Sequence, residues 1–366
     1  MLRNALFLFE AMKLYFICIK NLFYTTIFFM KKPLDYLEYI LNPASLLRTK
    51  KVLQVNPTAE PSRVEPDKSV VCVHEYNKEH CVTKHLEKVE ETYAFIKSES
   101  NTWINIDGLK KAEVENICEH FGMHVLIAED ILSVGQRPKM DEVDNVIFCV
   151  LNMLTFNNKT SELEIEQVSI VLGKKFVLSF EEDAHKDPFD TLREKLKISN
   201  SKVRQSGSDF LFYSLIDYIV DHYFIVMEKM GDKIEILEED IIKKADNRSL
   251  IKINMLRKEM ILLKRSIAPV RELISGILRS DNDLIDEKTE KYFKDVYDHI
   301  IQANDLSENY RDMVTSLQDL YLNNVNLRMN EVMKVMAIVT CLLAPATVIG
   351  GIFGMNFETK IGRAHV

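Results

Sequence analysis

The last apolar segment of the chain carries small and weakly polar side chains along one helical face. They recur every three to four residues, at Ala337, Thr340, Ala344, Thr347 and Gly351, and the stripe continues upstream through Asn330, Met333 and Met336. Small residues in such a stripe let two helices approach closely in a membrane. The stripe could equally line a water-filled axis of a symmetric oligomer, where small and hydroxyl side chains leave room for an ion. The residues alone leave the packing contact and the ion pathway equally open.

The segment that carries this stripe is predicted to cross a membrane. Residues 335–353 contain no charge, and as a helix they extend about 28 Å, close to the ~30 Å hydrocarbon core of a bilayer. The alternative is a buried core helix, but little sequence follows that could cover it. Arg328 and Lys334 precede the segment, and the next basic residue is Lys360. The positive-inside rule therefore predicts that the large N-terminal part is cytoplasmic.

Long helices must hold this segment in place. A helical pattern runs from about residue 290 to 353, interrupted only by Pro345, and a helix of that length measures roughly 90 Å, which predicts a stalk. Two helices are predicted before it, from about 209 and from about 250 to 278. Ser249 is the expected N-cap of the second helix, and Pro269 is expected to kink it.

The part before these helices is predicted to be a mixed α/β domain. Strand patterns occupy residues 69–76, 102–109, 145–156 and 166–183, the last with a hairpin turn at Gly173-Lys174. Helical patterns occupy residues 84–98, 111–121 and 125–132. The predicted fold class is therefore α+β: a mixed sheet with flanking helices, followed by long antiparallel helices, a stalk helix and a transmembrane helix. The expected divisions are an N-terminal leader (1–64), the α/β domain (65–200), an acidic helical pair (201–288), the stalk helix (289–334), the transmembrane helix (335–353) and a terminal loop and tail (354–366).

Composition narrows the classes of function. The net charge is −8 and no basic stripe stands out, which argues against nucleic-acid binding. The sequence shows no phosphate loop, nucleophile elbow or paired catalytic carboxylates, so we expect neither an enzyme nor an organic cofactor. The six cysteines are scattered, as in a reduced cytosolic chain. A zinc site is conceivable, but its residues fit no finger spacing and are more simply surface turn residues: His74, His80, Cys81 and His85.

The first thirty residues differ from the rest. They are strongly apolar, but charges interrupt them so that the longest uncharged piece, 21–30, is too short to span a bilayer. Two interpretations stay open: an interfacial helix, or translation from an upstream start codon that the native protein does not use.

Three residues directly after the span, Gly354, Met355 and Asn356, decide what the stripe does. Together with the preceding "NEVMKVMAIVT", this sequence resembles the CorA family of magnesium transport proteins, in which Gly-Met-Asn closes the first transmembrane helix. "TWINIDGL", "AEDILSVGQRPK", "EQVSIVL", "YSLIDYIVDHYF" and "YFKDVYDHI" resemble family segments in the same order, over roughly residues 65–358. The resemblance implies a homopentamer in membrane lipid that transports Mg²⁺ and Co²⁺.

The resemblance also gives the stripe a role. The helix that carries it would line the pore, with Gly354, Met355 and Asn356 as the selectivity filter. Mg²⁺ dehydrates reluctantly, so a ring of neutral amide and carbonyl oxygens that binds its water shell suits both selection and release. Relatives often carry a bulky residue where this chain has Ala344, so we expect a hydrophobic gate at Met333 and Met336 instead.

Four acidic residues would act as a cytoplasmic sensor. Taken singly, each is most simply a solvated surface acid. The resemblance implies that Asp130 and Asp295 meet across subunit interfaces and bind regulatory Mg²⁺, with Glu129 and Asp217 at a neighbouring site. A dication would relieve the repulsion between such carboxylates and so favour the closed state.

Two alternative functions and one anomaly accompany this interpretation. A zinc transporter of the same superfamily is one alternative, although Met355 favours Mg²⁺ and Co²⁺. A single-span signalling protein with a coiled-coil stalk is the other, and it predicts strict heptads and a dimer. The family continues with an acidic loop and a second membrane helix, whereas this sequence ends in "IGRAHV", which resembles adapter read-through. We therefore expect a truncated gene model.

Overall fold

The computed structural model describes residues 65–143, 145–157, 162–183, 188–280 and 282–354. By its contacts the chain divides after Tyr321 into two units. Residues 65–321 contain the sheet and most of the helices, and residues 322–354 belong to the other unit. Met355 and Asn356 of the predicted filter lie outside the described residues.

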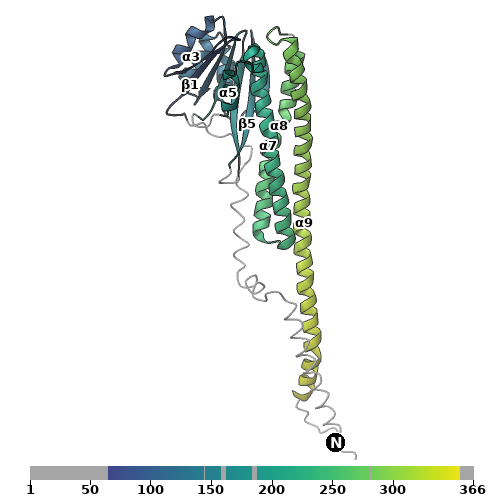
Figure 1. The fold of residues 1–366 in the computed structure, drawn as a ribbon. Helices are drawn as coiled ribbons and strands as arrows, with labels where there is room; N and C mark the ends of the chain where they lie inside the picture. The colour runs from purple at the N-terminus through teal and green to yellow at the C-terminus, as the bar shows by residue number, and fades with distance from the viewer. Residues whose placement is uncertain (1–64, 144, 158–161, 184–187, 281, 355–366) are drawn as a thin grey trace, which may run out of the picture. The chain divides into compact units, whose positions relative to one another are not determined.

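In the larger unit a seven-stranded mixed sheet lies between two sets of helices (Figure 1). Its spatial order is β2-β1-β3-β7-β6-β5-β4, and only β3 and β7 run parallel to each other. The strands are β1 (Val70–Tyr76), β2 (Cys81–Leu86), β3 (Asn101–Asp107), β4 (Lys139–Val143), β5 (Val146–Asn157), β6 (Glu162–Leu172) and β7 (Phe176–Glu181).

Helices cover both faces of the sheet, which gives two separate cores. One core joins the sheet to α3 (Lys111–His120), α4 (Val125–Leu132) and the 3₁₀ helix η2 (Val89–Lys97). The other joins it to α5 (Asp190–Lys197), to the long helices α7 (Ser208–Lys243) and α8 (Asn247–Arg279), and to the first part of α9. Burial on both faces explains why β5 is almost continuously apolar instead of alternating. A short helix, α6 (Lys202–Gln205), leads into α7.

The last helix, α9 (Glu287–Gly354), is unbroken and contains Pro345. Phe293, Val296 and Ile300 are fully buried, so its first turns belong to the core that α7 and α8 share. From Leu322 to Gly351 no α9 side chain is buried. The 18-residue stretch of α9 that is apolar enough to cross a membrane is entirely unburied, whereas the comparable stretch of α7 is mostly buried in the core. Of these two helices, α9 is the one with the character of a membrane span.

Three local predictions need correction. Residues 84–98 do not form one helix, because the segment contains the end of strand β2 followed by a 3₁₀ helix. The helix α8 begins earlier than predicted: its N-cap is Asp246, whose carboxylate accepts hydrogen bonds from the backbone N–H groups of Arg248 and Ser249. His74 is not a turn residue either, since it lies in β1 with its side chain buried.

Candidate metal centre

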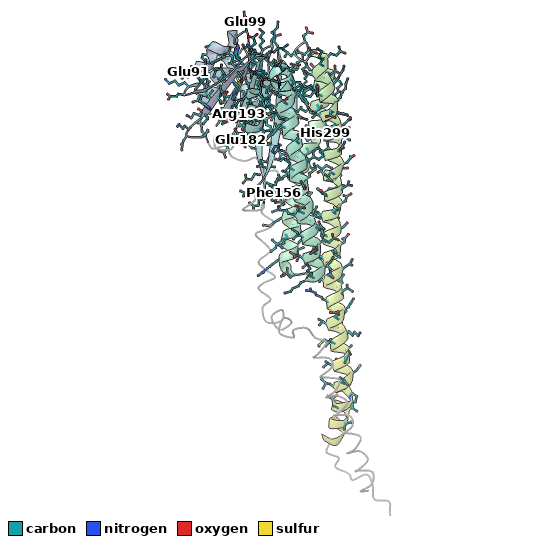
Figure 2. The ribbon with its side chains drawn as sticks, viewed as in Figure 1. Glu91, Glu99, Phe156, Glu182, Arg193 and His299 are labelled. Atoms are coloured by element: carbon teal, nitrogen blue, oxygen red, sulfur yellow. The ribbon has the colours of Figure 1, made fainter. Side chains whose placement is uncertain are left out.

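A cluster of three metal-ligating side chains lies between α7 and the first part of α9. Asp217 and Asp221 are one turn apart on α7. His299, which is labelled in Figure 2, comes from α9. The candidate ligand atoms of the three residues all lie within 4.8 Å of one another. Among the described residues this is the only group of three or more histidine, cysteine or acidic side chains so assembled. Two carboxylates and an imidazole can bind a divalent cation.

The charges at this cluster repel one another. Partial burial raises the pKa of Asp217, and the nearby carboxylates of Asp221 and Asp295 raise it further. A hydrogen bond with the hydroxyl of Tyr213, one turn earlier on α7, and the proximity of His299 act in the opposite direction. A cation bound here would relieve the repulsion between the carboxylates.

His299 supplies a second sign that the cluster is incomplete without a ligand. Its Nδ1 atom is buried and makes no hydrogen bond to any described residue. The ring is held in place by an edge contact with Phe224, with centroids 6.3 Å apart. Because buried polar atoms are nearly always satisfied, this nitrogen marks a place where a metal ion or a water molecule would complete the bonding.

The other two predicted sensor residues lie on α4, separate from this cluster. Asp130 accepts hydrogen bonds from Gln136 at 2.8 Å and from the ammonium of Lys139 at 2.5 Å. Lys139 also pairs with Asp141 at 3.2 Å. Burial alone would lower the pKa of Lys139, but its hydrogen bonds to the two aspartates outweigh this and raise it. Glu129, on the same helix, is exposed.

Within the described chain, then, the predicted residues form two groups. Asp217 lies in a cluster with Asp221 and His299, and the charge of the nearby Asp295 helps to raise its pKa. No described interaction joins Glu129 or Asp130 to that group. The predicted pairing of Asp130 with Asp295 was expected between subunits, so a single chain leaves it a prediction.

The predicted pore stripe lies on the second unit's part of α9. All eight residues of the stripe are exposed in the single chain: Asn330, Met333, Met336, Ala337, Thr340, Ala344, Thr347 and Gly351. The hydroxyl of Thr340 donates to the backbone carbonyl of Met336, and that of Thr347 donates to the carbonyls of Leu343 and Ala344. Since each hydroxyl proton is used within the helix, its oxygen presents lone pairs outward and can accept a hydrogen bond from water.

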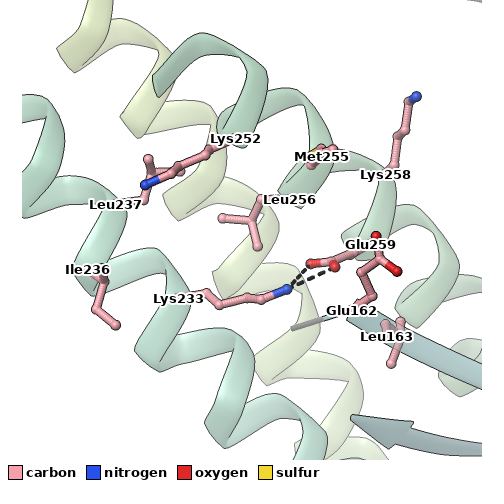
Figure 3. A pocket seen from close by; sticks show the side chains of 10 residues that line it. All are labelled: Glu162, Leu163, Lys233, Ile236, Leu237, Lys252, Met255, Leu256, Lys258 and Glu259. Carbon is pink, nitrogen blue, oxygen red and sulfur yellow. Dashed lines mark hydrogen bonds and ion pairs between the residues drawn. The ribbon is translucent and has the colours of Figure 1, made fainter. Parts of the chain in front are cut away.

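A groove of about 710 Å³ lies where α7 and α8 meet the start of β6 (Figure 3). Its walls are mainly apolar, but Lys233 of α7 spans it and donates to both carboxylate oxygens of Glu259 on α8, at 2.9 and 2.8 Å. Both side chains are largely buried, with 24% and 15% of their surfaces exposed. The ion pair therefore ties α7, which carries Asp217 and Asp221, to its neighbour α8.

Comparison with known proteins shows which family has this fold and these helices. The model of the CorA-like Mg²⁺ transporter family matches residues 98–360, most of the chain. The chain belongs to this family. It is 42% identical to the cobalt/magnesium transport protein CorA of Thermotoga maritima over 271 residues, covering 74% of this chain and 77% of that protein. Membership makes it a divalent-cation transporter of a non-enzymatic family.

Solved CorA structures share the fold. The complete CorA magnesium transporter of Methanocaldococcus jannaschii superimposes with a TM-score of 0.63 at 23% identity, over 81% of this chain and 90% of that one. The soluble domain of the same protein superimposes with a TM-score of 0.58 at 19% identity, covering 72% of this chain and 99% of that domain. The predicted sheet, long helices and stalk are thus confirmed as a CorA-like fold.

Two residues of the candidate metal centre, Asp221 and His299, were not identified from the sequence. Both sit four residues after a predicted CorA sensor residue, Asp221 after Asp217 and His299 after Asp295. Residues four apart share a helical face, so this repeated spacing was the available signal. What the spacing could not give was that the two faces pack against each other.

Proposed function

We propose that this chain is a subunit of a homopentameric channel that takes up hydrated Mg²⁺ and Co²⁺ across the cell (inner) membrane. The observation that carries the proposal is the unburied apolar part of α9 with its stripe of small and hydroxyl-bearing residues. A helix that is apolar around most of its surface suits lipid, and the stripe gives one face that suits water. Its family membership points to the same conclusion, and the N-terminal part would be cytoplasmic.

In this proposal the cation keeps its inner water shell in the pore. The oxygens of Thr340 and Thr347 accept hydrogen bonds from those waters, and neutral oxygens hold a dication weakly enough to release it. Gly354, Met355 and Asn356 form the filter at the end of the helix, where the Asn356 amide does the same. Met333 and Met336, which expose 54% and 62% of their surfaces, form the hydrophobic gate between these rings and the stalk.

Cytoplasmic Mg²⁺ would close the channel. Asp217, Asp221 and His299 form one part of the sensor, with Asp295 beside them. In the pentamer, Glu129 and Asp130 of the neighbouring subunit complete it. A dication that bridges the two groups stabilises the arrangement in which they are close, because only that arrangement relieves the repulsion between the carboxylates. Loss of Mg²⁺ then restores the repulsion and favours opening.

Uptake measured in a magnesium-starved host that expresses the complete reading frame tests the transport function. We expect Mg²⁺ and Co²⁺ uptake from the wild type, none from Asn356→Ala, and normal uptake from Asn324→Ala, which alters an asparagine of α9 outside the stripe. Native mass measurement should give five subunits for all three proteins. Normal uptake by Asn356→Ala would refute the filter, a dimer would support the signalling alternative, and preferential Zn²⁺ flux would support the zinc alternative.

A further inference from the structure

A small polar cavity lies on the sheet face that α5 covers, separate from the centre on α7 and α9. Its volume is about 270 Å³. Among its lining residues are Cys72 and His74 of β1, Thr83 and His85 of β2, and two residues of α5, Asp190 and Arg193. Figure 2 marks Arg193 beside the sheet. A thiol and two imidazoles at one cavity are the ligand types that zinc and cobalt prefer.

The strand register brings these three ligands to one face. Cys72 and His85 are direct cross-strand partners in the antiparallel β1–β2 pair. His74 follows Cys72 by two residues, and residues two apart in a strand point to the same side. The Sγ atom of Cys72 lies 3.3 Å from Nε2 of His74. At this separation the sulfur and the nitrogen can both coordinate one metal ion.

His74 is held ready to act as a ligand. Its Nδ1 atom lies 3.0 Å from Oγ1 of Thr83. If Nδ1 carries the proton and donates it to that hydroxyl, Nε2 keeps its lone pair on the side of the Cys72 thiol. Burial, and then the charges of Arg193, His85 and Lys197, lower the pKa of His74 to about 3, which favours the neutral ring. A neutral imidazole is the form that binds metals.

We propose that Cys72, His74 and His85 bind a thiophilic divalent metal, Zn²⁺ or Co²⁺, with the fourth position open to water. Binding would release the thiol proton to solvent and leave a thiolate ligand. His85 must rotate to close the site, since among the described residues only the Asp217 group is fully assembled within 4.8 Å. It is free to do so because its side chain is exposed on β2.

The charges around the cavity allow a dication. Arg193 and Lys197 contribute two positive charges, and Asp107 and Asp190 contribute two negative charges. The thiolate formed on binding then makes the site net negative. Mg²⁺ would not compete, because it prefers oxygen ligands and holds its waters. The site is therefore distinct in chemistry from the carboxylate-rich centre on α7 and α9, and it does not depend on the proposed transport function.

Cobalt absorption spectroscopy on the purified full chain in detergent tests the proposal. With one equivalent of Co²⁺ and excess Mg²⁺ to occupy oxygen sites, we expect a sulfur-to-cobalt charge-transfer band that added Zn²⁺ removes. His85→Gln should weaken Co²⁺ binding at least tenfold, and Thr83→Val, which removes the hydroxyl that orients His74, by roughly 10- to 100-fold. The control Cys81→Ser changes a thiol of β2, the strand of Thr83 and His85, that does not line the cavity, and it should leave the band unchanged.

Three results would overturn the proposal. One is the absence of a thiolate–cobalt band in the folded wild-type chain. Another is a band that persists at wild-type affinity in His85→Gln, a variant of an exposed residue whose fold circular dichroism can verify. The third is loss of the band in Cys81→Ser, which would assign the thiol elsewhere.

Discussion

Replacing Asp217 by asparagine should stabilise the metal-free protein and, at the same time, remove most of its stabilisation by Mg²⁺. The carboxylate of Asp217 is partly buried near two other carboxylates, and its pKa is raised first by burial and then by Asp221. Unit charges at the 4.8 Å limit of this cluster repel by about 0.9 kcal/mol in water and about 3.5 kcal/mol at an effective dielectric constant of 20. Because Asp221 is exposed, the screened end of that range applies, about 1 kcal/mol. Asparagine keeps an oxygen for the Tyr213 hydroxyl, so that hydrogen bond survives.

The pH dependence has a definite sign. A carboxyl whose folded pKa is raised binds its proton more tightly in the folded state, so the metal-free protein loses stability as pH rises from the unfolded towards the folded pKa of Asp217. Asp217→Asn removes this loss. Metal binding needs the deprotonated carboxylate, so stabilisation by Mg²⁺ should fall as pH falls through the same window.

Thermal unfolding of the full chain, with a chelator or with Mg²⁺, measures both effects. At Mg²⁺ a hundredfold above its dissociation constant the wild type should gain about 2.7 kcal/mol per site. Asp217→Asn should begin about 1 kcal/mol more stable in chelator and gain little from Mg²⁺. The control Asp305→Asn changes an exposed acid two turns further along α9 and should behave as wild type. A variant that is less stable than wild type in chelator, or that responds fully to Mg²⁺, would refute the assignment of Asp217 to a metal centre.

Three further predictions concern the α7–α8 ion pair, the sheet and the pore stripe. Lys233→Met leaves the Glu259 carboxylate partly buried without its partner, so it should destabilise the protein by about 1–3 kcal/mol in urea unfolding, and adding Glu259→Met should recover much of that loss. Burial raises the pKa of Glu166 to about 7, although hydrogen bonds from the backbone of Asp183 and Glu182 act to lower it. The free energy of unfolding should therefore fall between pH ~4.5 and ~7, by no more than about 3 kcal/mol. Glu166→Gln should flatten that part of the stability curve, and an unchanged curve would contradict this prediction. Thr340→Val removes an oxygen from the pore stripe while keeping the side chain's shape, so it should lower Mg²⁺ flux severalfold without changing oligomer mass, whereas Val339→Thr, off the stripe, should not lower it.

The elements that were predicted well are those in which burial alone determines the pattern of apolar residues. The two-sided burial of β5 demands a long apolar run, and the apolar periodicity of α7 continues for its whole length, so both were visible locally. Strands β2 and β4 are the two edge strands of the sheet. The side chains of β2 are largely exposed, and those of β4 are mostly half-buried. Their sequences, "CVTKHL" and "KMDEV", carry charges that resemble an exposed helix or loop. Pairing with a neighbouring strand defines them, and no local pattern reports that pairing.

The candidate sites divide in the same way. The stripe on α9 follows from helical spacing alone, because all its members share one helix. The metal centre does not, because it requires Asp217 and Asp221 of α7 to face His299 of α9, and that depends on how two distant segments pack. The family resemblance supplied Asp217 and Asp295 as isolated positions. Only the packed structure shows that Asp217 clusters with Asp221 and His299, with Asp295 nearby. It also shows that Lys139 of the same chain forms an ion pair with Asp130.

Weak cation binding at each centre is sufficient for a sharp response if the proposed pentamer switches as a unit. Moving a two-state equilibrium from 1:99 to 99:1 takes a preference of about 10⁴, or roughly 5.5 kcal/mol. Five identical centres share that requirement, so each needs to favour the closed state only about sixfold, roughly 1.1 kcal/mol. This is the size of the screened repulsion estimated above for Asp217 and its neighbour. A centre with one exposed carboxylate and an unsatisfied imidazole should bind a cation only weakly. Weak binding suits a sensor of a cation that is abundant in the cytoplasm, because the cation must be released when its concentration falls.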